Sequence, residues 1–160
     1  MLELLNKEVQ TTVKRETILE FENALLNTPG AFKGDTINCP LKHSFSNGMY
    51  VREIFIPAGT YLTGKIHKHD HPNFLLKGKV KVATEEGIQE LTAPLSMISK
   101  AGTKRALLVI EDCVWVTVHQ NLSNTQDLAE LEDMIIAKSY EEYDHFALNS
   151  HIENIKKLNA

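Results

Sequence analysis

The sequence predicts a mainly β protein, a single sandwich or barrel that carries an α-helical extension at each end. Between residues 49 and 121, short apolar runs alternate with turn residues at the spacing of an all-β domain. The flanking segments, 1–48 and 122–160, instead place apolar residues at helical spacing. A length of 160 residues fits one compact domain with a substantial core.

The N-terminal segment begins with a predicted amphipathic helix over residues 8–27. Its apolar stripe includes Val13, Ile18 and Phe21, with charged residues on the opposite side. The run Asn27-Thr28-Pro29-Gly30 ends this helix. Residues 31–41 are irregular, with turn signals at Gly34-Asp35 and Cys39-Pro40, and we expect an arm or loop lying against the main body.

Seven strands are predicted in the central segment. The last two form a hairpin around Glu111-Asp112, and in the final strand Trp115, Thr117 and His119 share one face, opposite a face of three valines. One face therefore packs and the other carries polar groups. The predicted strands are 49–56, 61–69, 73–84, 88–92, 95–99, 105–110 and 113–119.

The C-terminal segment returns to helical periodicity. Leu128, Leu131, Ile135 and Ile136 form an apolar face with acidic residues outside it. Ser139-Tyr140-Glu141-Glu142 has the spacing of a capping box and starts a second, short helix. We expect the tail from residue 149 onward to fray.

Composition narrows the classes of function. Hydrophobic residues make up 42% and charged residues 24% of the chain, and no apolar run is long enough to span a membrane. A net charge of -4 gives no broad basic surface, so we expect no nucleic-acid partner. Residues 1–5 lack the features of a secretory signal, and Cys39 and Cys113 form no disulfide framework. These features favour a cytoplasmic protein with two free, buried thiols.

A histidine cluster lies at the centre of the β segment, between Gly64 and Gly78. His67, His69 and His71 alternate, and in an extended strand alternate side chains point to one face. Such imidazoles could hold a metal ion if a further ligand came from elsewhere, and His119 is the candidate for it. The alternatives are an exposed histidine-rich edge strand and a His119 satisfied by a backbone carbonyl.

The motifs of this segment resemble those of the cupin superfamily, whose first motif is Gly, five residues, His-x-His, three or four residues, Glu, six residues, Gly. Its second motif is Pro-x-Gly-x-x-His. Here Gly64, His67-x-His69 and Gly78 correspond to the first, and residues 100–105 (Lys-Ala-Gly-Thr-Lys-Arg) to the second. More narrowly, the segments 52–60, 64–68, 101–106 and 111–119 resemble small cupin-like proteins encoded by phages and prophages, which are mostly of undefined function. The resemblance implies a cupin-like β-barrel, or jelly roll, over residues 49–121.

The sequence departs from the family pattern at two ligand positions. His71 stands seven residues before Gly78, where the family has its glutamate ligand, and Arg105 stands where it has its last histidine. A guanidinium stays protonated and is not an ordinary metal ligand. Either His119 completes a metal site with His67 and His71, with His69 as the alternate, or the site binds an anion and no metal.

Further polar residues are candidates for ligand binding. Arg105 could pair with a carboxylate or phosphate, alone or with Lys104, unless both form surface ion pairs with Glu111 or Asp112. Arg52, Tyr50 and Thr117 would contact a ligand if their strand faces line the barrel.

The sequence therefore leads to a cupin-like protein that binds a divalent transition metal (Zn, Fe, Mn or Ni), a small anionic ligand, or both. One alternative is a metal-dependent enzyme of oxygenase or isomerase type, with Arg105 orienting the substrate and no catalytic residue assigned. Another is a non-catalytic structural or protein-interaction protein. The cupin resemblance also implies a homodimer, with the N-terminal helix and arm as its expected contributors.

Overall fold

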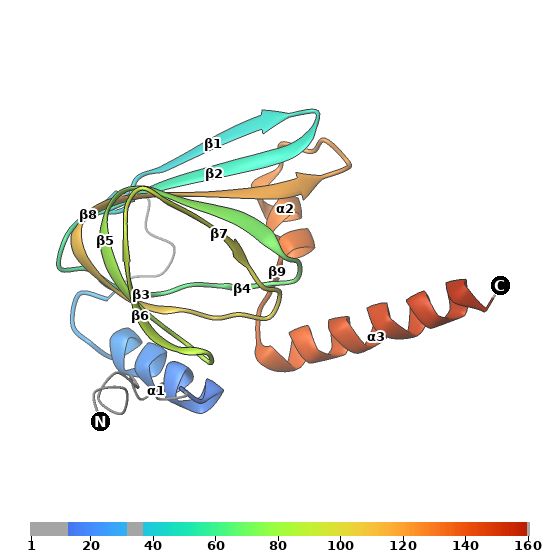
Figure 1. Cartoon of the computed structure of the whole chain (residues 1–160), viewed down its shortest axis with the longest axis horizontal. Helices are drawn as coiled ribbons and strands as arrows, with labels where there is room; N and C mark the ends of the chain where they lie inside the picture. The colour runs from blue at the N-terminus through green and yellow to red at the C-terminus, as the bar shows by residue number, and fades with distance from the viewer. Residues whose placement is uncertain (1–12, 32–36, 160) are drawn as a thin grey trace, which may run out of the picture.

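Seven antiparallel strands form a curled sheet that wraps around a shared interior, and helices flank it at both ends of the chain (Figure 1). The computed structural model describes residues 13–31 and 37–159. Its strands are β1 (Leu41–Ser46), β2 (Gly48–Ile56), β3 (Tyr61–Thr63), β4 (Ile66–His67), β5 (His71–Thr84), β6 (Gly87–Thr92), β7 (Leu95–Ser99), β8 (Ala106–Asn121) and β9 (Ile136–Ala137). Its helices are α1 (Arg15–Leu26), α2 (Leu128–Ile135) and α3 (Tyr140–Leu158).

The long strands β5 and β8 lie at the centre of the sheet, whose order is β1-β2-β8-β5-β6. Strand β7 pairs with the first part of β5, and β3 pairs with the first part of β8. Strands β4 and β9 form a separate two-stranded sheet. The predicted fold class, mainly β with a helical extension at each end, is confirmed.

The central strands bend where Gly78 faces Asp112. Gly78 has a φ of +92°, and a Cβ there would overlap the carbonyl group of Asp112. The pairing register shifts at this point, because β8 has two residues between Glu111 and Val114 where β5 has only one between Lys79 and Lys77. The predicted hairpin around Glu111-Asp112 is therefore wrong: β8 is one strand of 16 residues with a bulge, and the Asp112 carboxylate accepts the N–H of Ala58.

Two differences from the sequence prediction concern the N-terminal segment. Helix α1 begins at Arg15, whereas residues 8–12 of the predicted helix and the turn at Gly34-Asp35 lie outside the described residues. The stretch predicted as an arm leads into strand β1, which pairs with β2 along its whole length. Its side chains alternate between half-buried and exposed, so a strand there covers the β2 edge.

The C-terminal segment differs in length from the prediction. Helix α2 has the predicted apolar face, and the Ser139 hydroxyl accepts the N–H of Glu142 at the start of α3. Helix α3 then continues to Leu158, so the predicted short helix with a frayed tail from residue 149 is wrong. Within the described ranges, no helix is both long and apolar enough to cross a membrane.

The main core fills one part of the curled sheet and leaves the other part to polar residues. Leu75, Val80, Val82 and Val109 are fully buried there, with Trp115 at the end of this cluster. Cys39 and Cys113 belong to the same core and do not form a disulfide with each other, as predicted, and burial raises the pKa of the Cys113 thiol to about 11. Buried polar residues adjoin this cluster at Trp115, whose indole N–H donates to Asn73.

Candidate metal centre

Three histidines from three strands meet in the polar part of the sheet. His67 ends β4, His71 begins β5 and His119 lies near the end of β8. The ring centroids are 4.1 Å apart for His67 and His71, 4.6 Å for His71 and His119, and 5.1 Å for His67 and His119. Each offers one nitrogen that lies within 4.8 Å of the other two. We call this group the histidine triad.

The backbone of His67 is fixed on both sides by distant parts of the chain. In the two-stranded sheet His67 pairs with Ile136 of β9. The His67 carbonyl accepts the N–H of Gly102 at 2.9 Å, and the next residue, Lys68, donates its N–H to the Ile135 carbonyl at 2.8 Å. The C-terminal extension therefore positions this imidazole.

A buried asparagine supports His71. The Asn73 side chain donates to the His71 carbonyl at 3.1 Å and accepts the indole N–H of Trp115 at 2.8 Å. Asn73 is fully buried and lies opposite Thr117 in the sheet. Sequence reasoning missed Asn73, although a polar residue two positions after His71 in a strand was a signal that it shares the histidine's face.

Aromatic stacking and one hydrogen bond orient His119. Its Nε2 shares a hydrogen bond of 3.0 Å with the Thr117 hydroxyl, and its ring stacks on that of Tyr50, the residue opposite it in β2. The Tyr50 hydroxyl in turn hydrogen-bonds to Nδ1 of His43 at 2.8 Å. Thr117 and Tyr50, both predicted as ligand contacts, thus line the same inner face as the triad.

The three histidines have the protonation state that a metal ion requires, and two of them offer a buried ring nitrogen to it. Burial, followed by the charges of neighbouring histidines, lowers the pKa of His67 to about 2 and that of His119 to about 3, and burial also lowers the pKa of His71. All three are therefore neutral near pH 7, the ligand form of imidazole. Nδ1 of His67 and Nε2 of His71 are buried without a hydrogen-bond partner among the described residues. The residues present fit a transition-metal ion.

His69 lies apart from the triad. It is exposed, and its ring makes an edge contact with Phe146 of α3 at 5.3 Å. The chain bends at Lys68 and His69, between β4 and β5, so the strict alternation that the sequence suggested is interrupted there. His67 and His71 still meet because the bend brings two separate strands together.

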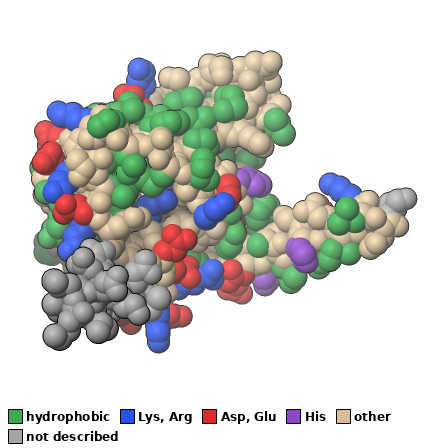
Figure 2. All heavy atoms as spheres, in the orientation of Figure 1, with side chains coloured by type: hydrophobic (Ala, Val, Ile, Leu, Met, Phe, Trp, Pro, Cys, Tyr) green, Lys and Arg blue, Asp and Glu red, His purple; other side chains and the backbone are tan. Residues whose placement is uncertain are grey.

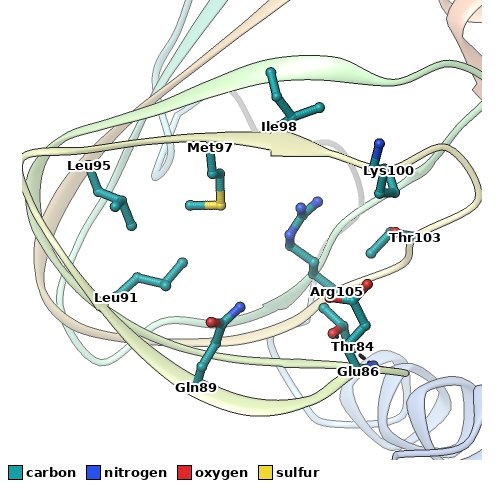
Figure 3. Close-up of a pocket in the computed structure, with 10 residues that line it drawn as sticks. All are labelled: Thr84, Glu86, Gln89, Leu91, Leu95, Met97, Ile98, Lys100, Thr103 and Arg105. Atoms are coloured by element: carbon teal, nitrogen blue, oxygen red, sulfur yellow. Dashed lines mark hydrogen bonds between the residues drawn. The ribbon is translucent and has the colours of Figure 1, made fainter.

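Arg105 extends from the loop before β8 into a neighbouring cavity of about 280 Å³ (Figure 3). Its guanidinium donates to the Ser99 hydroxyl at 2.9 Å, and Ser99 lies opposite His71 in the sheet. Leu91, Leu95 and Met97 form the apolar wall of this cavity, as Figure 3 shows. Burial lowers the pKa of Arg105, and in the described part of the chain no carboxylate forms an ion pair with it.

Arg52 also lies near the triad. It pairs with Thr117 in the sheet and shares the inner face with Tyr50. The positive charges of Arg52 and Arg105 both act to lower the pKa of His67. Within residues 13–31 and 37–159, the Arg52 guanidinium has no hydrogen-bond or ion-pair partner.

Two further charged residues near the triad, Lys104 and Asp70, have partners in the structure. Lys104 faces α1, where its Nζ lies 2.8 Å from Glu22, so neither the predicted anion contact nor the predicted surface pair applies to it. Asp70 accepts from Lys100 Nζ and from the Ala101 N–H at 2.9 and 2.8 Å. It stands at a second cleft, of about 360 Å³, which opens onto His71 and His119.

Comparison with known proteins gives structural neighbours only. No family model and no curated protein matches the sequence. A cupin-2 domain protein from Shewanella frigidimarina is 11% identical, with 51% of this chain and 79% of that chain covered and a TM-score of 0.43. KdgF from Halomonas sp. is 13% identical (56% and 82% covered, TM-score 0.46), and an RmlC-like cupin from Shewanella frigidimarina is 13% identical (56% and 79% covered, TM-score 0.45).

Proposed function

We propose that this chain is a cupin-type protein that binds one divalent transition metal through His67, His71 and His119. The observation that carries the proposal is the triad itself, in which three neutral imidazoles each place a nitrogen within 4.8 Å of the other two. Two of the imidazoles have a buried nitrogen without a hydrogen-bond partner among the described residues. Imidazole nitrogens suit Zn, Fe, Ni and Cu, and Mn is also compatible with such a site. With three protein ligands, coordination positions remain for a small molecule.

The charges around the triad favour an anionic small molecule. Arg52 and Arg105 both lie near enough to lower the pKa of His67, and neither guanidinium forms an ion pair in the described ranges. Glu132 acts on Arg52, and Glu86 acts on Arg105, only from beyond ion-pair distance. A metal would add two further positive charges to this region. A carboxylate or phosphate bound beside Arg105 would offset that charge and form bidentate hydrogen bonds with the guanidinium.

The scarcity of acidic side chains around the described clefts favours ligand binding over catalysis. A metal-dependent enzyme of oxygenase or isomerase type needs an acid or base beside its substrate. The described lining of the cleft at His71 and His119 holds one carboxylate, Asp70, which accepts hydrogen bonds from Lys100 and Ala101. The described lining of the cavity at Arg105 also holds one, the exposed Glu86. We therefore place ligand binding first and the enzyme second.

Elemental analysis of the purified, untagged protein tests the metal. We expect near-stoichiometric transition metal in the wild type, as isolated or after refilling with Zn, Fe, Mn or Ni salts. His67→Ala and His119→Ala should lose it, whereas His69→Ala, a matched control outside the triad, should keep it. A wild type that takes up no metal after refilling would overturn the proposal.

A cobalt-loaded sample tests the anionic ligand separately. Titration with acetate and with inorganic phosphate should change the visible absorption of bound Co²⁺ if either anion enters its coordination shell. In Arg105→Met the metal content should stay unchanged, while the anion concentration at half effect should rise about tenfold or more. Equal titrations in wild type and Arg105→Met would exclude Arg105 as the anion site.

A further inference from the structure

The second half of α3 projects from the body of the protein as a single helix. The first half contacts the barrel through Tyr143, which packs on Gly102, and through Phe146, which meets His69. From Leu148 to Leu158 every side chain is exposed except that of Ser150, which is half-buried. Figures 1 and 2 show this part of α3 standing clear of the sheet.

An apolar stripe runs along this projecting half. Leu148, Ile152 and Ile155 follow one another at intervals of four and three residues, the spacing of positions that meet a partner helix. Their side chains are 58%, 41% and 46% exposed. A lone helix of this length is marginal in water, because its stability in proteins comes mainly from packing its apolar face. We therefore expect a second surface to pack on this apolar stripe.

Charges along α3 indicate which partner fits. Glu141, Glu142 and Asp144 lie in its first turns, and Lys156 and Lys157 lie in its last. Figure 2 shows acidic side chains near the base of the projecting helix and basic side chains near its tip. A second copy of the same helix in the opposite direction would place basic turns beside acidic turns at both ends, whereas a parallel copy would place like charges together.

We propose that the projecting half of α3 forms an antiparallel pair with α3 of a second copy of this chain. A centre near residue 150 sets Leu148 of one copy against Ile152 of the other and brings Lys156 level with Asp144, whose carboxylate also pairs with Arg15 of its own chain. The pair is isologous, so each copy contributes the same surface.

In the proposed dimer α3 forms the contact, whereas the sequence led us to expect the N-terminal helix and arm there. Helix α1 is already occupied within its own chain: Ile18 is buried, and Glu22 contacts both Lys104 and Thr63. The apolar residues of α3 beyond Phe146 have no comparable partner in the described part of the chain.

Light scattering after size exclusion tests the surface, with the full-length protein at micromolar concentration. The wild type should be a dimer and Ile152→Asp a monomer. Asn154→Asp introduces the same charge on the opposite side of the helix and should remain a dimer. A monomeric wild type, an unaffected Ile152→Asp, or a wild-type monomer whose α3 binds anionic lipid vesicles or another protein would each overturn the proposal.

The direction of the pair is tested by a spin label on Leu158→Cys, which lies three residues after Ile155 and beside the stripe. With a rise of 1.5 Å per residue, an antiparallel pair centred near residue 150 separates two labels at position 158 by about 24 Å along the axis. A parallel pair would bring them to about 10 Å, the distance between helix axes, and would overturn the antiparallel assignment.

Discussion

The imidazole rings of His67 and His119 lie parallel, with 3° between their planes and 5.1 Å between their centroids. The two residues come from β4 and β8, which belong to different sheets. Because each is positioned by its own backbone pairing, to Ile136 and to Tyr50 respectively, their juxtaposition results from the fold and not from a local motif. The following predictions depend on that arrangement.

The first prediction concerns pH and the stability of the metal-free protein. In the unfolded chain His67 and His119 titrate near 6.5, whereas burial lowers the folded-state pKa values to about 2 and about 3. Below pH 6.5 the unfolded chain therefore binds protons that the folded chain does not, and stability falls as the pH falls. At pH 5 the loss should reach up to about 2 kcal/mol for each histidine, relative to pH 8.

Urea unfolding of the metal-free protein between pH 8 and pH 5 measures this slope. The double variant His67→Gln, His119→Gln should show a flatter dependence over the same interval, whatever its stability at pH 8. A double variant with the wild-type slope would contradict the titration of these two residues.

The second prediction concerns Arg105. Its guanidinium is half-buried without a carboxylate partner in the described ranges, so replacing the charge with an apolar side chain removes a desolvation cost. We expect Arg105→Met, beside Leu95 and Met97, to leave the free energy of unfolding unchanged or to raise it by up to about 2 kcal/mol. Urea denaturation is the measurement.

Lys104 is the matched control for Arg105, since it is the neighbouring cation but has a partner. Lys104→Met breaks its ion pair with Glu22 and should cost about 2 kcal/mol. If Arg105→Met lost as much stability as Lys104→Met, Arg105 would be a structural residue and not a ligand group.

The third prediction concerns the bend in β5. Gly78→Ala combines an unfavourable φ of +92° with an overlap between the new Cβ and the Asp112 carbonyl. It should cost about 3 kcal/mol or more in thermal or urea unfolding. Gly59→Ala has a similar φ of +81° but open space around the new Cβ, so it should cost only about 1–2 kcal/mol. Equal losses would show that the overlap is relieved by a small shift of β8.

The fourth prediction concerns Asn73, which links His71 to the single tryptophan of the chain. Asn73→Ala leaves the Trp115 indole N–H without its acceptor and should lower stability by about 1–3 kcal/mol. It should also weaken zinc binding about tenfold or more, because His71 loses its support. Trp115 fluorescence reports both effects, and Asn154→Ala on the exposed face of α3 should change neither.

Much of the sheet was predictable from sequence because its strands alternate and are separated by clear turns. Strand β1 was not predictable, because Lys42, His43 and Ser44 are all polar and give no apolar–polar alternation, although the strand covers the edge of β2. The bulge at Glu111-Asp112 has the composition of a hairpin turn, and only the pairing of both halves of β8 with β5 distinguishes the two.

The sequence predicted which histidines form the candidate site, but not how the strands bring them together. His67, His71 and His119 do lie together, as the sequence suggested, and their metal binding stays a prediction. The sequence suggested one continuous strand carrying His67 and His71, whereas a bend at His69 separates two strands. The two-residue strand β9 carries no periodicity, and buried partners such as Asn73 and Ser99 emerge only from cross-strand register, which sequence patterns do not specify.

The pairing of His67 with Ile136 also sets an order of events during synthesis. His71 and His119 are made and can pair through β5, β7 and β8 before β9 exists, whereas β4 gains its partners in β9 only after Ile135 and Ile136 have left the ribosome. The three histidines are therefore held together by the complete set of backbone pairs only after the chain has been made past Ile136. Nascent chains that end before α2 would lack the partners that β9 gives to β4.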